Sequence, residues 1–266
     1  MAEVRSKQEI EIMRKGGELL ARGLQAAVDA VRPGIELREL DQIAETVLRA
    51  GGGEPSFKGY QSRKNDAAFP STVCISVNEE VVHGPGSRTR VVHDGDIVGL
   101  DIGVWYEGMC TDMAVTVPVG KVSDEVKQLL EVTRQSMLAG IGAVRGDVPV
   151  SAVGKAVEEL VKPYGYGIVR DLVGHGVGKK VHEDPHVPNF YDPRYDKIFL
   201  KTGMTIAVEP MITMGDWRVN TLDDGWTIVT EDGSWAAHFE VTILVTDKGY
   251  ELITPLIKID TLKAKS

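Results

Sequence analysis

Two strand-like segments of the chain share a pattern that constrains its fold more than any other feature. The stretches GDIVGLD (95–101) and GMTIAVE (203–209) each begin with Gly, alternate apolar residues and end in a carboxylate. A second apolar strand follows each of them, with Asp112 leading into MAVTVPV and Glu240 into VTILVT. Apolar residues at period two are typical of strands that bury one face. The chain therefore contains a similar pair of strands twice, and each pair carries two acidic side chains.

Helical segments precede both strand pairs. Apolar residues recur at spacings near three and four, the pattern of amphipathic helices, in 7–32, 37–50, 124–144 and 150–162. Gly or Pro follows each segment and marks its end. Laying 31–48 over 144–161 aligns the apolar residues with one constant offset. We therefore predict an α+β protein of two pseudo-symmetric halves, about 7–120 and 121–256, with helices covering one face of a mainly antiparallel curved sheet.

Charge, hydropathy and cysteine content exclude several classes of protein. A net charge of −9 disfavours a nucleic-acid-binding surface, which needs a basic face, and suits cations or the amino group of a peptide. Cys74 and Cys110 are too few for a disulfide framework, and a disulfide between them is disfavoured. No signal-peptide core and no membrane-spanning apolar run is found, so we expect a cytoplasmic protein.

The four strand carboxylates, Asp101, Asp112, Glu209 and Glu240, need compensation if they are buried. If 105–108 is a four-residue hairpin loop, Asp101 and Asp112 stand opposite each other with Cβ atoms about 5 Å apart. A single strand carboxylate often lies on a solvated face, but four in a duplicated apolar pattern point to bound cations.

Histidines near these strands offer nitrogen ligands. His175 lies in LVGHGVG, where glycines let the backbone approach a ligand closely. Residues 182–186 read HEDPH, which has the letters of the zinc-protease motif H-E-x-x-H. That motif works only on a helix, and Pro185 and Pro188 disfavour a helix here. We therefore predict no helical zinc-protease motif, and a cage of carboxylates and His175 for one or two divalent metals such as Mn, Fe(II), Co or Zn.

These residues resemble the type I methionine aminopeptidases over nearly the whole chain. The resemblance rests on the order of the four carboxylates and His175, and on NEEVVHG (78–84), GHGVGKKVHEDPHVPN (174–189), TIAVEP (205–210) and DGW (224–226). It implies the pita-bread fold, with 1–266 as a single catalytic domain. It also implies a monomeric cytoplasmic enzyme that binds neither membrane nor nucleic acid and removes the N-terminal methionine of nascent proteins and peptides, near the ribosome, when the second residue is small.

The resemblance also implies roles for individual residues. Two divalent ions (Co, Mn, Fe(II) or Zn) would be held by Asp101, Asp112, His175, Glu209 and Glu240. Water activated by both ions would attack the first peptide bond. Glu209 would carry the proton to the leaving amine, and His83 and His182 would contact the substrate and stabilise its charged intermediate.

A slot for the methionine side chain would be lined by Phe57, Tyr60, Phe69, Cys74, Val181 and Trp226. For Phe57 and Val181, simple core packing is the favoured interpretation.

The chain departs from the family pattern at several positions. The segment between Tyr60 and Cys74 is several residues longer than expected, and Val181 stands where an aromatic residue is expected. His238 and Val241 flank Glu240 where Gln and His are expected.

Two alternatives share the fold. Prolidases and aminopeptidase P have the same five ligands but usually carry an additional N-terminal domain, whereas the first helical segment here starts at about residue 7. Relatives that only bind peptides generally lack the ligands, which are all present here.

Overall fold

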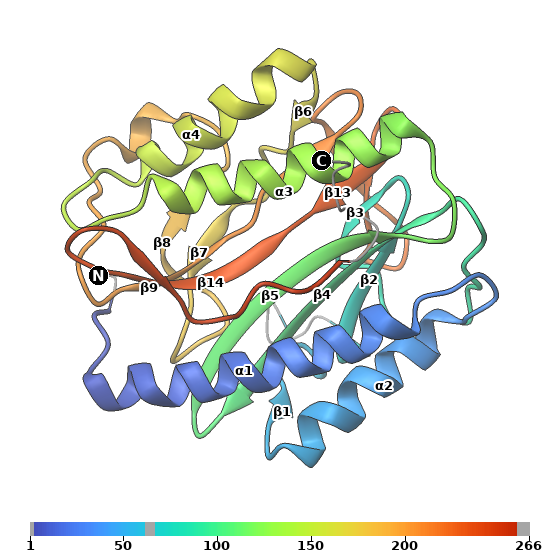
Figure 1. The fold of residues 1–266 in the computed structure, drawn as a ribbon, viewed down its shortest axis with the longest axis horizontal. Coiled ribbons are helices and arrows are strands. Elements are labelled where there is room, and N and C mark those ends of the chain that lie inside the picture. The colour runs from blue at the N-terminus through green and yellow to red at the C-terminus, as the bar shows by residue number, and fades with distance from the viewer. Residues whose placement is uncertain (1–2, 62–66, 260–266) are drawn as a thin grey trace.

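A large antiparallel sheet runs through both halves of the chain (Figure 1). The computed structural model describes residues 3–61 and 67–259. Within these residues the sheet has nine strands: β1 (Glu54–Pro55), β2 (Val73–Val77), β4 (Ile97–Tyr106), β5 (Met109–Pro118), β7 (Gly174–Gly176), β8 (Glu183–Val187), β9 (Thr205–Val208), β14 (Glu240–Val245) and β15 (Tyr250–Leu252). Their order is β1-β4-β5-β14-β9-β7-β8, with β2 added to β4 and β15 to β14.

Two three-stranded sheets extend this architecture. One has the order β13-β10-β6 and the other β11-β12-β3. Their strands are β3 (Glu80–Val82), β6 (Gly167–Ile168), β10 (Met211–Thr213), β11 (Val219–Thr221), β12 (Ile228–Thr230) and β13 (Ala236–His238).

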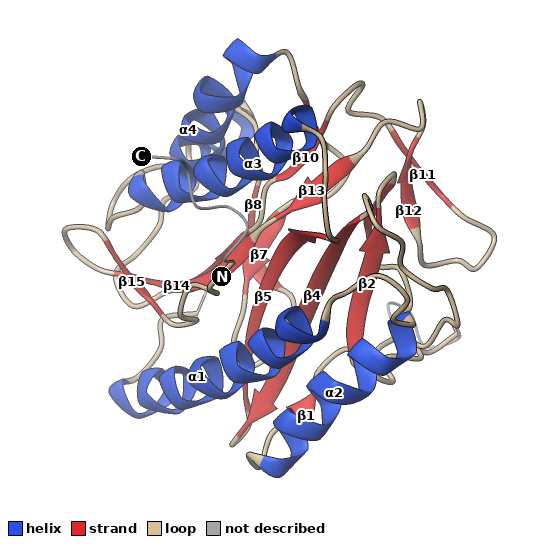
Figure 2. Ribbon diagram, turned by 45° about the vertical axis from the view of Figure 1, so that its right-hand side comes forward, coloured by secondary structure: helices blue, strands red, loops and turns tan. Residues whose placement is uncertain are grey.

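Four α-helices of the described residues lie on one face of the large sheet, in two pairs (Figures 1 and 2). They are α1 (Lys7–Ala30), α2 (Leu37–Ala50), α3 (Asp124–Gly142) and α4 (Ser151–Val161). Each lies within two residues of its predicted bounds. None of the described helices is both long and apolar enough to cross a membrane. The predicted α+β class, with helices over an antiparallel sheet, is confirmed.

Local chemistry fixes the ends of the first helix pair. The Ser6 side chain accepts a hydrogen bond from the Glu9 N–H, and the Glu9 side chain accepts one from the Ser6 N–H, so a capping box starts α1. Helix α2 stops at Gly51, and Gly52 follows with φ 83°, a left-handed conformation that glycine adopts without steric cost.

The strand alternation separates the core from the site. Leu100, Ile102 and Val104 of β4 are buried in the main hydrophobic core together with residues of the helices. Because side chains alternate along a strand, Asp101 points to the other face of the sheet. The helix-covered face is therefore the packed one, and the opposite face is free to carry polar chemistry.

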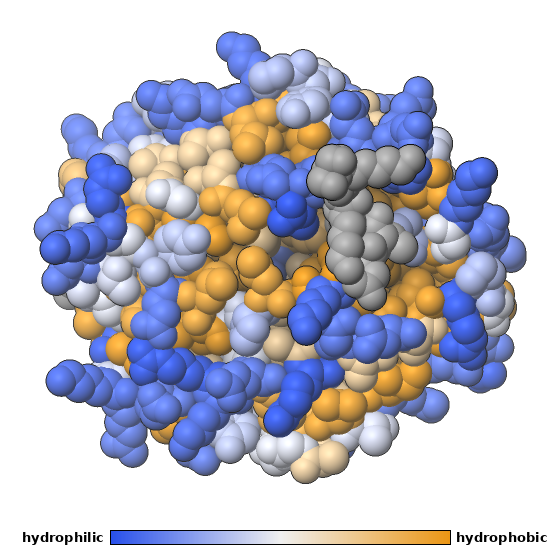
Figure 3. Space-filling model, viewed as in Figure 1, coloured by the Kyte–Doolittle hydropathy of each residue, from blue (hydrophilic) through white to orange (hydrophobic). Residues whose placement is uncertain are grey.

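Viewed from the helix side, the surface has hydrophilic side chains around its rim and hydrophobic ones between the two helix pairs (Figure 3). A small cavity of about 90 Å³ is lined by Met113, Met137, Phe239 and Ile257, among others.

The hairpin between β4 and β5 differs from its predicted register. Tyr106 pairs with Met109, so the loop has two residues, Glu107 and Gly108, rather than four. Both have positive φ, 46° and 83°, as a type I′ turn requires. Asp101 consequently pairs with Ala114, and Asp112 pairs with Gly103. The aspartates are diagonal neighbours and not directly opposite, but they stay on one face because the register differs by an even number of residues.

The two halves of the chain meet where β5 pairs with β14. Only two residue pairs are registered there, Glu240 with Ala114 and Val241 with Met113. This short ladder places a carboxylate of the second half beside the strand that carries Asp112.

Candidate active site

Five neighbouring strands of the large sheet each bring one predicted metal ligand to the same place. In sheet order they are β4, β5, β14, β9 and β7. The ligands are Asp101, Asp112, Glu240, Glu209, which directly follows β9, and His175. Ligand atoms of Asp112, His175 and Glu240 lie within 4.8 Å of one another, and His175 Nε2 is 3.4 Å from Glu209 Oε1. Residues far apart in the sequence thus form one acidic cluster.

The negative charges of this cluster are not balanced by protein cations. Asp101, Asp112 and Glu240 are buried, and the Glu209 side chain is only 12% exposed. One carboxylate oxygen of each of the four acids is buried without a hydrogen-bond partner within the described residues. The described residues that line the cavity include no Lys or Arg. Buried carboxylates of this kind require pairing or metal coordination, so the donor set fits divalent cations.

Burial changes the protonation of these groups in the metal-free protein. It raises the pKa of Asp101 from 3.8 to about 7. Burial, together with the negative charges of neighbouring acids, raises the pKa of Asp112, Glu209 and Glu240 well above the ordinary values. A divalent cation has the opposite effect, because it stabilises the ionised carboxylates.

His175 is oriented as a nitrogen ligand. Its Nδ1 is 2.9 Å from the Gly176 carbonyl oxygen, which can only accept a hydrogen bond. The proton therefore resides on Nδ1, and Nε2 offers its lone pair toward Glu209. Burial lowers the pKa of His175 to about 3, which keeps the ring neutral at physiological pH.

Two further histidines stand at the rim of the cluster. His182 lies 4.4 Å from His175, measured between ring centroids, and its Nδ1 is 3.1 Å from the Tyr60 hydroxyl. It directly precedes β8, so HEDPH lies in an extended segment and the prediction against a helical zinc motif is confirmed. His83 has φ 61°, a strained conformation for a non-glycine residue that is common at functional sites. Burial lowers its pKa to about 4.

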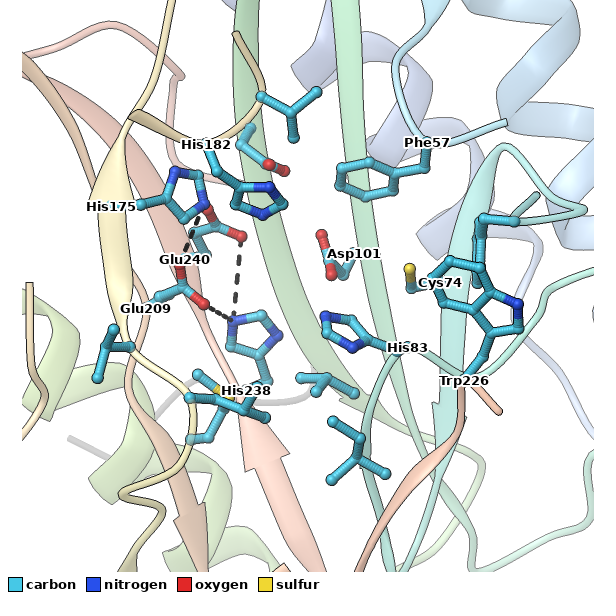
Figure 4. A pocket seen from close by; sticks show the side chains of 18 of the residues that line it. Phe57, Cys74, His83, Asp101, His175, His182, Glu209, Trp226, His238 and Glu240 are labelled. Carbon is cyan, nitrogen blue, oxygen red and sulfur yellow. Dashed lines mark ion pairs between the residues drawn. The ribbon is translucent and has the colours of Figure 1, made fainter. Parts of the chain in front are cut away.

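A cavity of about 410 Å³ opens next to the acidic cluster (Figure 4). All predicted site residues line it: Phe57, Tyr60, Phe69, Cys74, His83, Asp101, Asp112, His175, Val181, His182, Glu209, Trp226 and Glu240. The Phe69 and Trp226 rings meet edge to face at 5.1 Å between centroids. Asp224 holds the Trp226 loop by accepting hydrogen bonds from the backbone N–H groups of Trp226 and Thr227.

The apolar side of the cavity combines lining with core packing. Val181 is buried in a cluster with Cys110 and Val177, and Phe57 packs against that cluster while also lining the cavity. Both cysteines are free, as expected, and burial raises the pKa of the Cys74 thiol. Residues 62–66 of the lengthened segment lie outside the described residues.

Two features of the site were not predicted. His238 also lines the cavity, and its placement two positions before Glu240 was the available signal, because side chains two positions apart in extended backbone point the same way. Val241, in contrast, is buried in the main core and is not among the described residues that line the cavity.

The second unpredicted feature is the anchoring of Glu183 by the N-terminal segment. Arg5 forms an ion pair with Glu183, and its guanidinium also donates to the Thr205 hydroxyl at 3.0 Å and to the Val177 carbonyl at 3.1 Å. The Arg5 side chain is 1% exposed. It fixes the segment that carries His182 against β9.

Comparisons with known proteins agree with this geometry. The sequence matches the metallopeptidase family M24 over residues 11–247. A methionine aminopeptidase of Clostridium perfringens is 45% identical over 257 residues, which cover 96% of this chain and 99% of that protein. The crystal structure of a methionine aminopeptidase from Thermotoga maritima superposes with a TM-score of 0.91 at 39% identity, covering 96% of this chain and all of that one.

A prolidase from Pyrococcus furiosus shares the fold, with a TM-score of 0.76 at 23% identity, but this chain covers only 66% of it. The family model matches most of the chain, and the methionine aminopeptidases named above align with it over nearly their full length. The chain therefore belongs to metallopeptidase family M24 and, within it, to the type I methionine aminopeptidases.

Proposed function

We propose that this protein removes the N-terminal methionine from peptides and nascent proteins whose second residue is small, by metal-dependent hydrolysis of the first peptide bond. The observation that carries the proposal is the position of the uncompensated acidic cluster. It forms one wall of a cavity that is also lined by apolar and aromatic side chains. A hydrolytic centre and a side-chain pocket thus share one space.

Two divalent cations, of the class Co, Mn, Fe(II) or Zn, would be held by Asp101, Asp112, His175, Glu209 and Glu240. Bound there, the cations supply water of lowered pKa and polarise the scissile carbonyl. Each of the four acids supports this assignment, because one of its buried carboxylate oxygens has no hydrogen-bond partner in the described part of the chain.

The proton transfer is assigned to Glu209. At 12% exposure its side chain is more open than that of Glu240, at 3%. It can therefore take a proton from the attacking water and deliver it to the amine that leaves.

His182 and His83 would stabilise the negative charge that develops on the carbonyl oxygen. If the Tyr60 hydroxyl donates to His182 Nδ1, the ring proton resides on Nε2 and can be donated to substrate. Tyr60 is then a positioning residue as well as part of the pocket wall.

Selectivity for methionine is assigned to the apolar side of the cavity. The wall that includes Phe57, Phe69, Cys74 and Trp226 suits a flexible, polarisable thioether, which adapts to aromatic surroundings. The neutral thiol of Cys74 adds no charge there.

The whole of 1–266 is proposed to act as one catalytic domain with half-repeats of about 7–120 and 121–256. Asp101 and Asp112 come from the first half, whereas His175, Glu209 and Glu240 come from the second, so neither half holds the complete set. We further propose that the enzyme acts as a cytoplasmic monomer on nascent chains near the ribosome, without binding nucleic acid or membrane.

The first test is the metal-dependent cleavage of two tripeptides. Protein stripped with a chelator is restored with Mn or Co and mixed with Met-Ala-Ser or Ala-Pro-Ala, and products are followed by mass spectrometry. We expect metal-dependent release of methionine from the first peptide only, and none with the Asp112→Asn variant. Cleavage of only the proline peptide would move the assignment to the prolidases, and no cleavage of either would indicate a peptide-binding protein.

A further inference from the structure

His238 is held rigidly beside the acidic cluster. Its backbone N–H donates to the Thr116 hydroxyl, and that hydroxyl lies 2.9 Å from the His238 carbonyl oxygen as well. In β13 it also pairs with Met211 of β10. The residue is 3% exposed, so neither its backbone nor its ring is free to turn toward solvent.

The ring nitrogen that faces the cluster has no partner. His238 Nε2 is buried and without a hydrogen bond within the described residues. It lies 3.9 Å from Glu209 Oε2 and 4.0 Å from Glu240 Oε2, and Figure 4 shows it directed at both carboxylates. These distances are too long for direct hydrogen bonds. A buried polar atom left unpaired is costly unless something else occupies the space in front of it.

The same distances suit two ligands of one metal ion. With metal–ligand bonds of roughly 2.1 Å, ligand atoms on one ion lie about 3.4 Å apart at tetrahedral angles and up to about 4.2 Å apart when they are opposed. The proposed ligand pair on the other side of Glu209 has a comparable spacing, because His175 Nε2 lies 3.4 Å from Glu209 Oε1. The two oxygens of Glu209 therefore each face one imidazole.

We propose that His238 is a further nitrogen ligand of the metal centre, on the side of Glu209 remote from His175. The inference rests on the proposed metal site and adds a ligand at a position where the family pattern led us to expect Gln. An imidazole is a stronger ligand than an amide for Co, Zn and Fe, whereas Mn prefers oxygen donors. A second imidazole should therefore shift the preference of the centre away from Mn.

Metal binding by the full-length apoprotein tests this without any activity measurement. Isothermal titration with Co(II) and with Mn(II) is carried out on the wild type, on His238→Gln, and on His186→Gln as the matched control. His186 lines the same cavity but is exposed and is not a proposed ligand. We expect His238→Gln to weaken Co(II) binding by at least about tenfold, with a smaller effect on Mn(II), and His186→Gln to leave both unchanged.

Affinity alone does not separate a ligand from a residue that only supports ligands, so the coordinated nitrogens are also observed. Pulsed electron paramagnetic resonance of the Mn(II)-loaded protein detects imidazole nitrogens bound to the ion. We expect signals from two imidazoles in the wild type, with one lost in His238→Gln and the other in His175→Gln. The wild-type spectrum needs no variant, so it remains decisive if a substitution prevents folding.

The outcomes separate the inference from the site on which it rests. If Asp112→Asn binds metal as tightly as the wild type, the proposed metal site itself is wrong. If Asp112→Asn loses the metal while the wild-type spectrum contains one imidazole only, which His238→Gln does not alter, the site stands and the role of His238 is refuted.

Discussion

Replacing Asp101 by Asn should make the metal-free protein more stable at neutral pH, even though it removes a metal ligand. Burial raises the pKa of Asp101 from 3.8 to about 7. Between these pH values the folded protein keeps a proton that the unfolded chain has released, so stability falls as the pH rises. Above about pH 7 the carboxylate must be ionised in its buried position, and the destabilisation is complete.

The magnitude follows from the width of this window. Each pH unit corresponds to about 1.4 kcal/mol, so the ionised Asp101 destabilises the metal-free protein by roughly 4 kcal/mol at pH 8. Roughly 2 kcal/mol of this develops between pH 5 and pH 7. Asparagine has nearly the same shape and no charge, so the variant should lack this part of the pH dependence.

Urea unfolding with a chelator present measures the effect at pH 5, 6, 7 and 8. Asp101→Asn should be several kcal/mol more stable than the wild type at pH 8, with the difference shrinking toward pH 5. The matched control is Asp171→Asn, which removes an exposed carboxylate from the same cavity and should follow the wild type. Parallel curves for Asp101→Asn and the wild type would refute the claim that burial destabilises the ionised carboxylate. Added Co(II) should reverse the ranking, because only the wild type gains the full ligand set.

Three other substitutions test separate parts of the molecule. Arg5→Ala removes the cationic partner of Glu183, whose carboxylate then keeps the hydrogen bond from the Lys180 N–H, and should destabilise the protein by roughly 3 kcal/mol in urea unfolding. Arg14→Ala, at an exposed ion pair, should change stability by less than about 1 kcal/mol; equal effects would count against the anchoring role of Arg5. Tyr60→Phe removes the hydroxyl next to His182 and should lower kcat for cleavage of Met-Ala-Ser by about tenfold with KM nearly constant. An unchanged kcat in steady-state measurements would exclude the positioning role of Tyr60. Trp226→Ala opens the apolar wall of the cavity and should raise KM for the same peptide by at least about tenfold without affecting Co(II) affinity. A change in metal affinity alone would contradict the assignment of Trp226 to the side-chain pocket.

The sequence was sufficient for the helices because their periodicity and their ends agree. Gly51 stops α2 at the predicted residue, and the apolar face of each helix covers the core. The period-two pattern also located the ligand-bearing strands. Where apolar residues alternate along a strand, the pattern fixes on which face of the sheet each acidic side chain lies. The duplicated pattern alone did not specify the order of the strands in the sheet. That order is what brings all predicted site residues to one cavity.

The features that escaped prediction depend on details that a single segment does not contain. The β4–β5 register was wrong because Glu107 adopts φ 46°, a conformation that Asn or Asp would have signalled in a two-residue turn. The Arg5–Glu183 pair joins residues 178 positions apart, and no local sequence pattern predicts such a pair. His238 was noticed only as a departure, because its meaning depends on which carboxylates its ring nitrogen faces.

The short ladder between β5 and β14 has a mechanical consequence. Backbone pairing across this boundary is limited to two residue pairs, yet Asp112 and Glu240 stand beside it on adjacent strands. Any cation held by both side chains therefore cross-links β5 to β14, and with them the two halves of the sheet. The metal ligands would therefore also limit local opening between β5 and β14. After the ions are removed, amide hydrogen exchange should become faster along this strand pair before it becomes faster in the helices.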